Sequence, residues 1–167
     1  MRKIMNIYLI RHADAEKASL KIRDFDRELS QAGKKSIETS ATYWKTLIPT
    51  FNYIVSSPLL RAKHTAEIIA KQFEINDKIL IDQRLSPGSE TEFLIDIANE
   101  LEVEELAFVG HQPDLSEHLA NFISEFNINI VFKKGSIAKV NLPGKIKKYS
   151  GILEFLIPPD IFKEKTG

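Results

Sequence analysis

The sequence contains no cysteine among its 167 residues. Disulfide bonds, thiolate metal sites and thiol nucleophiles are therefore excluded together. No apolar run approaches the roughly 18 residues that a membrane span requires. Residues 1–10 begin with Met-Arg-Lys, but the apolar run that follows is short and is interrupted by Asn6, so we expect no signal peptide. The cytoplasm is the working expectation for location.

The sequence also lacks a charge bias, because 23 basic residues balance 23 acidic ones. This balance gives no reason to expect nucleic acid or an acidic membrane surface as a partner. The lysines at 133–134 and 145–148 are expected to keep sheet edges soluble. With 43% hydrophobic residues, the chain is long enough for one core and short for two. We expect a single domain over residues 1–162, a frayed tail at 163–167, and a monomer.

Apolar strand-like runs alternate with segments of helical period through most of the chain. This alternation predicts an α/β fold, a three-layer sandwich with a mostly parallel sheet between helices. Strands are expected at 4–10, 52–55, 79–81, 106–109, 128–132, 136–142 and 152–157, the last three forming an antiparallel extension. Helices are expected to begin at Ser30, at Ser57-Pro58, at a Ser89–Glu92 capping box and at Gln112-Pro113.

Three of the expected strands end in basic or imidazole side chains. Arg11 and His12 follow the first strand, Arg61 follows the second, and His111 follows the strand at 106–109. Ligands of open α/β sheets bind outside the carboxyl ends of the strands, so these four groups are expected to converge. Two guanidinium groups beside two imidazoles suit a dianion such as phosphate. A neutral histidine in such a pocket is also a nucleophile that can attack phosphorus.

Four segments carry a family resemblance, in the right order along residues 5–125. They are Leu9-Ile10-Arg11-His12-Ala13, Arg27-Glu28-Leu29-Ser30-Gln31-Ala32-Gly33, Ser56-Ser57-Pro58-Leu59-Leu60-Arg61-Ala62-Lys63-His64-Thr65-Ala66, and Val109-Gly110-His111-Gln112-Pro113. The chain resembles the histidine phosphatase superfamily, also called phosphoglycerate-mutase-like. One departure is Ala13, which replaces the signature glycine and is tolerated where the local φ is negative.

The resemblance implies a role for each of the four groups. His12 is the catalytic nucleophile that forms a phosphohistidine intermediate, Arg11 and Arg61 hold the phosphoryl group, and His111 is the second imidazole at this group. It implies an enzyme, a metal-independent phosphatase that needs no cofactor. The short chain without a large inserted cap looks most like the SixA-type phosphohistidine phosphatases. The expected partner is then a phosphorylated protein, or alternatively a small phosphorylated molecule.

The segment where larger relatives carry an acidic proton donor reads Gln83-Arg84-Leu85-Ser86-Pro87-Gly88-Ser89-Glu90. Glu90 is a possible proton donor there, although a place at a helix start explains it as well. An alkoxide leaving group benefits from such a donor, whereas the imidazole of phosphohistidine leaves as a neutral ring. A site without a strong acid therefore favours phosphohistidine in a protein as the substrate.

Two other functions stay open at this point. One is a phosphatase for a small metabolite, with Glu90 or Asp14 as the proton donor. The other is a non-catalytic phosphate-binding module, against which the retention of all four groups counts. A zinc site at His12, His111 and Asp14 is disfavoured because arginines beside it would repel the metal. His64 and His118 are interpreted as structural, and Asp24, Asp26 and Arg27 as either substrate contacts or solvated loop residues.

Overall fold

The structure is a computed structural model that describes residues 4–163. The strands are β1 (Ile4–Arg11), β2 (Tyr53–Ser56), β3 (Ile79–Ile81), β4 (Glu105–Gly110), β5 (Ile137–Pro143) and β6 (Ile152–Ile157). The helices are α1 (Gln31–Trp44), α2 (Leu60–Phe73), α3 (Thr91–Leu101) and α4 (Asp114–Ile123). Short 3₁₀ helices include η1 (Asp24–Asp26), η3 (Gln83–Leu85) and η4 (Pro159–Phe162).

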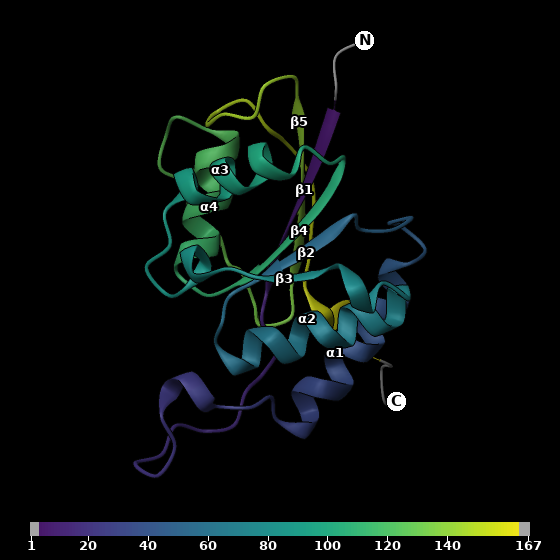
Figure 1. Ribbon diagram of the computed structural model, residues 1–167, viewed down its shortest axis with the longest axis vertical. Helices are drawn as coiled ribbons and strands as arrows, with labels where there is room; N and C mark the ends of the chain where they lie inside the picture. Colours follow the sequence, from purple (N-terminus) through teal and green to yellow (C-terminus); the bar gives the residue numbers. More distant parts are fainter. Residues whose placement is uncertain (1–3, 164–167) are drawn as a thin grey trace.

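The strands form one sheet in the order β3-β2-β4-β1-β5-β6 (Figure 1). β1 and β2 both pair with β4 in parallel, and β2 pairs with β3 in parallel. β5 runs antiparallel to both β1 and β6. The predicted fold, a mostly parallel sheet between helices with antiparallel C-terminal strands, is confirmed.

Alternate residues of β1 enter two cores, one on each face of the sheet. Ile7 and Leu9 pack with apolar residues of α3 and α4, whereas Tyr8 and Ile10 pack with those of α1 and α2. Figure 1 shows the same division, with α3 and α4 on one side of the strands and α1 and α2 on the other. Both faces of β1 are thus covered, so its apolar residues follow one another without polar alternation.

The helix starts show where sequence reasoning was right and where it was wrong. Ser30 caps α1 as predicted, accepting a hydrogen bond from the Gly33 amide at 3.0 Å. The predicted Ser89–Glu92 capping box is wrong, since Glu90 is the N-cap of α3 and makes no side-chain cap. The Ser89 amide instead donates to the Asp114 carboxylate, and Glu92 forms an ion pair with Lys148.

The expected strand at 128–132 is also wrong, because this segment is irregular. Its carbonyl groups bond to side chains instead of to a neighbouring strand. Ile130 accepts from the Ser116 hydroxyl and Phe132 accepts from Arg11. The position beside β1 that a strand would occupy is taken by β5.

Two expectations concern the ends of the chain and the membrane. The expected frayed tail lies outside the described residues except for Lys163, whose ammonium lies 3.4 Å from the Asp160 carboxylate. Within residues 4–163, no helix combines the length and the apolar character that crossing a membrane requires.

Candidate active site

Three strands deliver the predicted site residues to one edge of the sheet. Arg11 is the last residue of β1 and lies opposite Gly110, the last residue of β4. The His12 amide then donates to the Gly110 carbonyl at 3.1 Å. The Ser57 amide, just after β2, donates to the Val109 carbonyl at 3.0 Å. These bonds extend the parallel pairing past the strand ends and bring the three loops together.

His12 is buried, and its hydrogen bond defines its tautomer. Nδ1 lies 2.7 Å from the Ala13 carbonyl oxygen. A carbonyl only accepts, so Nδ1 carries the proton and Nε2 keeps a free lone pair. Burial, followed by the charges of Arg61, Arg11 and Lys134, lowers the pKa of His12 to about 4, although the bond to Ala13 opposes this shift. The ring is therefore neutral at pH 7, with Nε2 available as a nucleophile.

Each arginine is held at its terminal nitrogens and keeps a buried Nε–H. Arg11 donates from Nη1 to the Phe132 carbonyl at 2.7 Å. Arg61 donates from Nη1 to the Asp24 carbonyl at 2.8 Å and from Nη2 to the Asp24 carboxylate at 3.1 Å. The Nε atoms of both side chains have no hydrogen-bond partner among the described residues. Since buried polar groups are normally paired, these two N–H groups are suited to a bound anion.

His111 lies beside His12, with 5.3 Å between the ring centroids. Its Nε2 is 2.7 Å from the Ser57 hydroxyl, and its buried Nδ1 has no partner in the described part of the chain. Burial, with the charges of His12, Arg61 and Arg11, lowers the pKa of His111 to about 3, while the charge of Asp24 opposes this shift. The structure thus brings together all four groups predicted from the sequence.

Ala13, the departure from the family signature, fits its place. Its φ does not lie in the positive region, so the condition under which a methyl group is tolerated there is met. Its side chain is buried, and its amide donates to the Thr65 hydroxyl at 3.1 Å. Thr65 lies one helical turn after Arg61 on α2, so the same helix carries Arg61 and supports the His12 loop.

The two carboxyl groups proposed as proton donors lie in different places. Asp14 follows the His12 loop, where its oxygens contact the Lys134 ammonium and the Ser30 hydroxyl, both at 2.8 Å. The bond to Lys134 lowers the pKa of Asp14, so this side chain is ionised at neutral pH. Glu90 is exposed and lines a separate depression with Asp114 and Glu117. No hydrogen bond or ion pair of the described residues joins it to the four groups, so its role as donor stays a prediction.

Sequence reasoning missed the supporting residues of the site. Ser57 orients His111, and Lys134, expected only to keep a sheet edge soluble, is close enough to lower the pKa of His12. Asp24 bonds to Arg61 across 37 positions of sequence. No local pattern reports such long-range contacts. By contrast, His118 is a buried residue with its Nδ1 3.0 Å from the Thr91 hydroxyl, in agreement with its structural interpretation.

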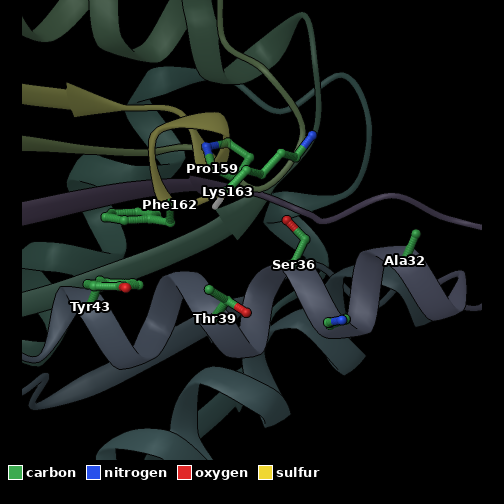
Figure 2. Close-up of a pocket in the computed structure, with 8 residues that line it drawn as sticks. Ala32, Ser36, Thr39, Tyr43, Pro159, Phe162 and Lys163 are labelled. Atoms are coloured by element: carbon green, nitrogen blue, oxygen red, sulfur yellow. The ribbon is translucent and has the colours of Figure 1, made fainter. Parts of the chain in front are cut away.

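A cavity away from the four groups lies between α1 and η4. It has a volume of about 600 Å³, and the ring of Tyr43 stacks on that of Phe162 at its edge (Figure 2). Its lining residues are Ala32, Lys35, Ser36, Thr39, Tyr43, Pro159, Phe162 and Lys163. None of the four convergent groups lines this cavity, so cavity volume alone does not locate the candidate active site.

Comparison with known proteins gives relatives in sequence and in fold. The model of the histidine phosphatase superfamily (branch 1) matches residues 7–87, a range that includes Arg11, His12 and Arg61. An uncharacterized protein of Picosynechococcus sp. is 36% identical over 116 residues, which are 68% of this chain and 70% of that protein.

Solved structures share the fold over nearly the whole chain. The protein histidine phosphatase SixA in complex with tungstate superposes with a TM-score of 0.83 at 21% identity, covering 95% of this chain and 100% of that one. A protein of Agrobacterium tumefaciens assigned as the phosphohistidine phosphatase SixA gives 0.79 at 26%, covering 93% and 98%. A mycobacterial glucosyl-3-phosphoglycerate phosphatase gives 0.65 at 13%, covering 90% and 97%. The chain belongs to the histidine phosphatase superfamily.

Proposed function

We propose that this protein is a phosphatase that forms a covalent phosphohistidine intermediate on His12 and acts on phosphohistidine in a protein. The observation that carries the proposal is the neutral His12, whose Nε2 is unprotonated and on which the charges of Arg11 and Arg61 act. The Nε–H groups of both arginines have no hydrogen-bond partner within residues 4–163. These donors suit the non-bridging oxygens of a phosphoryl group, and the two positive charges balance a dianion.

In the first step, the lone pair of His12 Nε2 attacks phosphorus while the bond from phosphorus to the leaving group breaks on the opposite side. The His12 ring gains a positive charge, which its Nδ1–H shares with the Ala13 carbonyl. In the second step, water attacks phosphorus and the P–Nε2 bond breaks. Inorganic phosphate takes up the water proton, and neutral His12 is restored. Arg11 and Arg61 stabilise the equatorial oxygens in both steps.

The choice of an N–P substrate rests on the charge of the carboxyl groups at the site. Lys134 holds Asp14 in its ionised form. Partial burial alone would raise the pKa of Asp24, but the hydrogen bond and charge of Arg61 and the charge of Arg27 outweigh it and lower the pKa overall. Neither group carries a proton at pH 7, so neither can protonate an alkoxide. A phosphorylated imidazole whose second nitrogen is already protonated leaves without such help.

We also propose that the reaction requires no metal ion. The support is the charge arrangement, in which Arg11, Arg61 and Lys134 all act on His12. Three cations beside the nucleophile supply the positive charge that a metal ion supplies in other phosphatases.

The second candidate is a phosphatase for a small phosphorylated metabolite, with Glu90 as the proton donor. The fold shared with a glucosyl-3-phosphoglycerate phosphatase favours it, because the same architecture there serves a phosphate monoester. Glu90 would then need to move toward the four groups when substrate binds.

The test is turnover of a phosphohistidine-containing protein beside a panel of phosphate monoesters, in the presence of a metal chelator. We expect preference for the N–P substrate, full activity with chelator, loss of turnover in His12→Ala, and little change in Glu90→Gln. Preference for a monoester together with a large loss in Glu90→Gln would favour the second candidate. Activity that the chelator abolishes would contradict the metal-free mechanism.

A further inference from the structure

One segment next to the site, residues 15–29, leaves the body of the molecule after β1 and returns to it before α1 (Figure 1). Its two ends are joined by a bridge between Ala15 and Leu29 and by a 2.9 Å hydrogen bond from the Glu16 amide to the Glu28 carbonyl. The short helix η1 lies within it and begins with Asp24. This segment contributes none of the four groups that carry the proposed reaction.

Asp24 connects this segment to Arg61. Its carbonyl and its carboxylate each accept one hydrogen bond from the Arg61 guanidinium, at 2.8 and 3.1 Å. The other carboxylate oxygen accepts from Arg27 Nε at 2.9 Å. The Arg61 side chain is 7% exposed and that of Asp24 is 61% exposed. The segment therefore contacts the buried Arg61 guanidinium from the solvent side.

The donors that Asp24 uses determine what Arg61 still offers. A guanidinium group has a rigid planar set of five N–H donors, so holding the two terminal nitrogens fixes the direction of Nε–H. Asp24 engages Nη1 and Nη2, while Nε is buried without a partner in residues 4–163. The charge of Arg61 contributes to the lowered pKa of both His12 and His111, whose ring centroids lie 5.3 Å apart.

We infer that Asp24 is a positioning residue, which holds Arg61 so that its Nε–H faces the phosphoryl group and makes residues 15–29 part of the phosphate site. The inference rests on the proposed function for the identity of the anion. Arg11 has an analogous arrangement, in which the Phe132 carbonyl holds Nη1 and no described residue is a partner of Nε. Among the described residues of segment 15–29, only Asp24 has a side chain that forms a hydrogen bond with one of the four groups.

A second interpretation gives the opposite sign. A carboxylate that contacts Arg61 also competes with phosphate for it and repels a dianion. Two substitutions separate the interpretations, because Asp24→Asn and Asp24→Ala remove the same charge, but only asparagine keeps an acceptor oxygen for Nη2. Positioning predicts different affinities for the two variants, whereas competition predicts equal ones.

The experiment measures the dissociation constant for orthovanadate by calorimetry in the wild type and both variants. We expect Asp24→Ala to bind vanadate roughly five- to tenfold more weakly than Asp24→Asn, the size of one lost hydrogen bond. Asp26→Asn is the control for charge on the same segment, since Asp26 pairs with exposed Arg23 instead. Its affinity should match the wild type. Equal affinities of the two Asp24 variants, whether tighter or weaker than wild type, would overturn the inference.

A second measurement reports on Arg61 directly. In ¹⁵N-labelled protein, vanadate should shift the Arg61 Nε–H resonance in the wild type and in Asp24→Asn, and this signal should broaden in Asp24→Ala. A merely structural role would change the melting temperature without this difference. Turnover that persists in His12→Ala, together with the expected vanadate affinities, would refute the proposed reaction alone. Turnover that is lost in His12→Ala, together with equal vanadate affinities of the two Asp24 variants, would refute only the role of Asp24.

Discussion

At the scale of single residues, the proposed chemistry depends on the proton of one imidazole ring. The Ala13 carbonyl fixes this proton on Nδ1 of His12, and burial keeps the ring neutral. Because of these two features Nε2 carries no proton, so no base has to remove one before Nε2 attacks. A carboxylate in place of the carbonyl would raise the pKa of His12 and favour its protonated, inactive form.

We predict that His12 remains neutral as pH falls from 8 to 5. Its pKa is lowered to about 4, so protonation begins only below pH 5. Long-range ¹H–¹⁵N spectra of the histidine rings follow this directly. The urea-unfolded chain is the matched control, because its histidines should titrate near pH 6.5. A His12 midpoint near 6.5 in the folded protein would contradict the account of its burial.

The four groups of the site were predictable because each lies at or shortly after the end of a strand that the sequence identifies by its apolar run. Parallel strands place their carboxyl ends at one edge of the sheet, so Arg11, His12 and His111 were expected at that edge. The pairing of β1 with β4 makes them neighbours there. The residues that orient them were not predictable. Asp24 reaches the site from the short helix η1 and Lys134 from a turn, and the positions of both depend on the finished fold.

At the scale of elements, one glycine determines how closely α1 approaches the His12 loop. A Cβ atom at Gly33 would lie 2.1 Å from the Asp14 carbonyl oxygen. The same loop is fixed to the helix start by the Ser30 amide, which donates to that oxygen at 3.0 Å. The glycine of the family-like segment is therefore required by close approach of backbone, a reason that the sequence does not contain.

We predict that Gly33→Ala destabilises the protein by roughly 1–3 kcal/mol, even though alanine favours a helix interior. Chemical denaturation measures the change in the free energy of unfolding. Gly110→Ala is the control, because its Cβ would meet only the Leu115 side chain at an ordinary 3.5 Å. Equal stability of the two variants would show that α1 can move away from Asp14 at no cost.

The element boundaries were less predictable than the elements themselves. α2 begins at Leu60 and not at Ser57-Pro58, because the Ser57 hydroxyl bonds to His111 and accepts from the Leu59 amide, which keeps residues 57–59 outside the helix. Side-chain contacts with distant residues determine where such a helix begins, and the helix propensities of the local residues do not predict these contacts.

At the scale of the whole molecule, three buried histidines are kept neutral by the fold. Burial is the largest cause in each case, lowering the pKa of His12 and His118 to about 4 and that of His111 to about 3. In the unfolded chain all three take up protons near pH 6.5. Below this pH the unfolded state therefore binds more protons than the folded state, and folding becomes less favourable.

We predict that the free energy of unfolding falls as pH decreases from 6.5 toward 4, by roughly 1.4 kcal/mol per pH unit for each of these histidines. Urea denaturation at a series of pH values measures the slope. His118→Gln should lower the slope by about a third of the histidine contribution without changing turnover, because His118 contacts Thr91 and not the site. An unchanged slope in this variant would contradict the neutral state of His118.

The fold class was predictable at this scale because the order of apolar runs along the chain specifies alternating strands and helices. The spatial order β3-β2-β4-β1-β5-β6 was not contained in that pattern. The resemblance supplied the expectation that the strand ends meet, and the structure supplies the register that places Arg11 opposite Gly110.

The measurement that tests the central claim most directly is trapping of the phosphoenzyme. The wild type is mixed with a ³²P-labelled phosphohistidine protein, quenched in alkali within the first turnover, and digested for mass spectrometry. The account predicts an acid-labile phosphoryl group on Nε2 of His12, absent in His12→Ala. Label on His111, or turnover with no covalent phosphoenzyme, would contradict it.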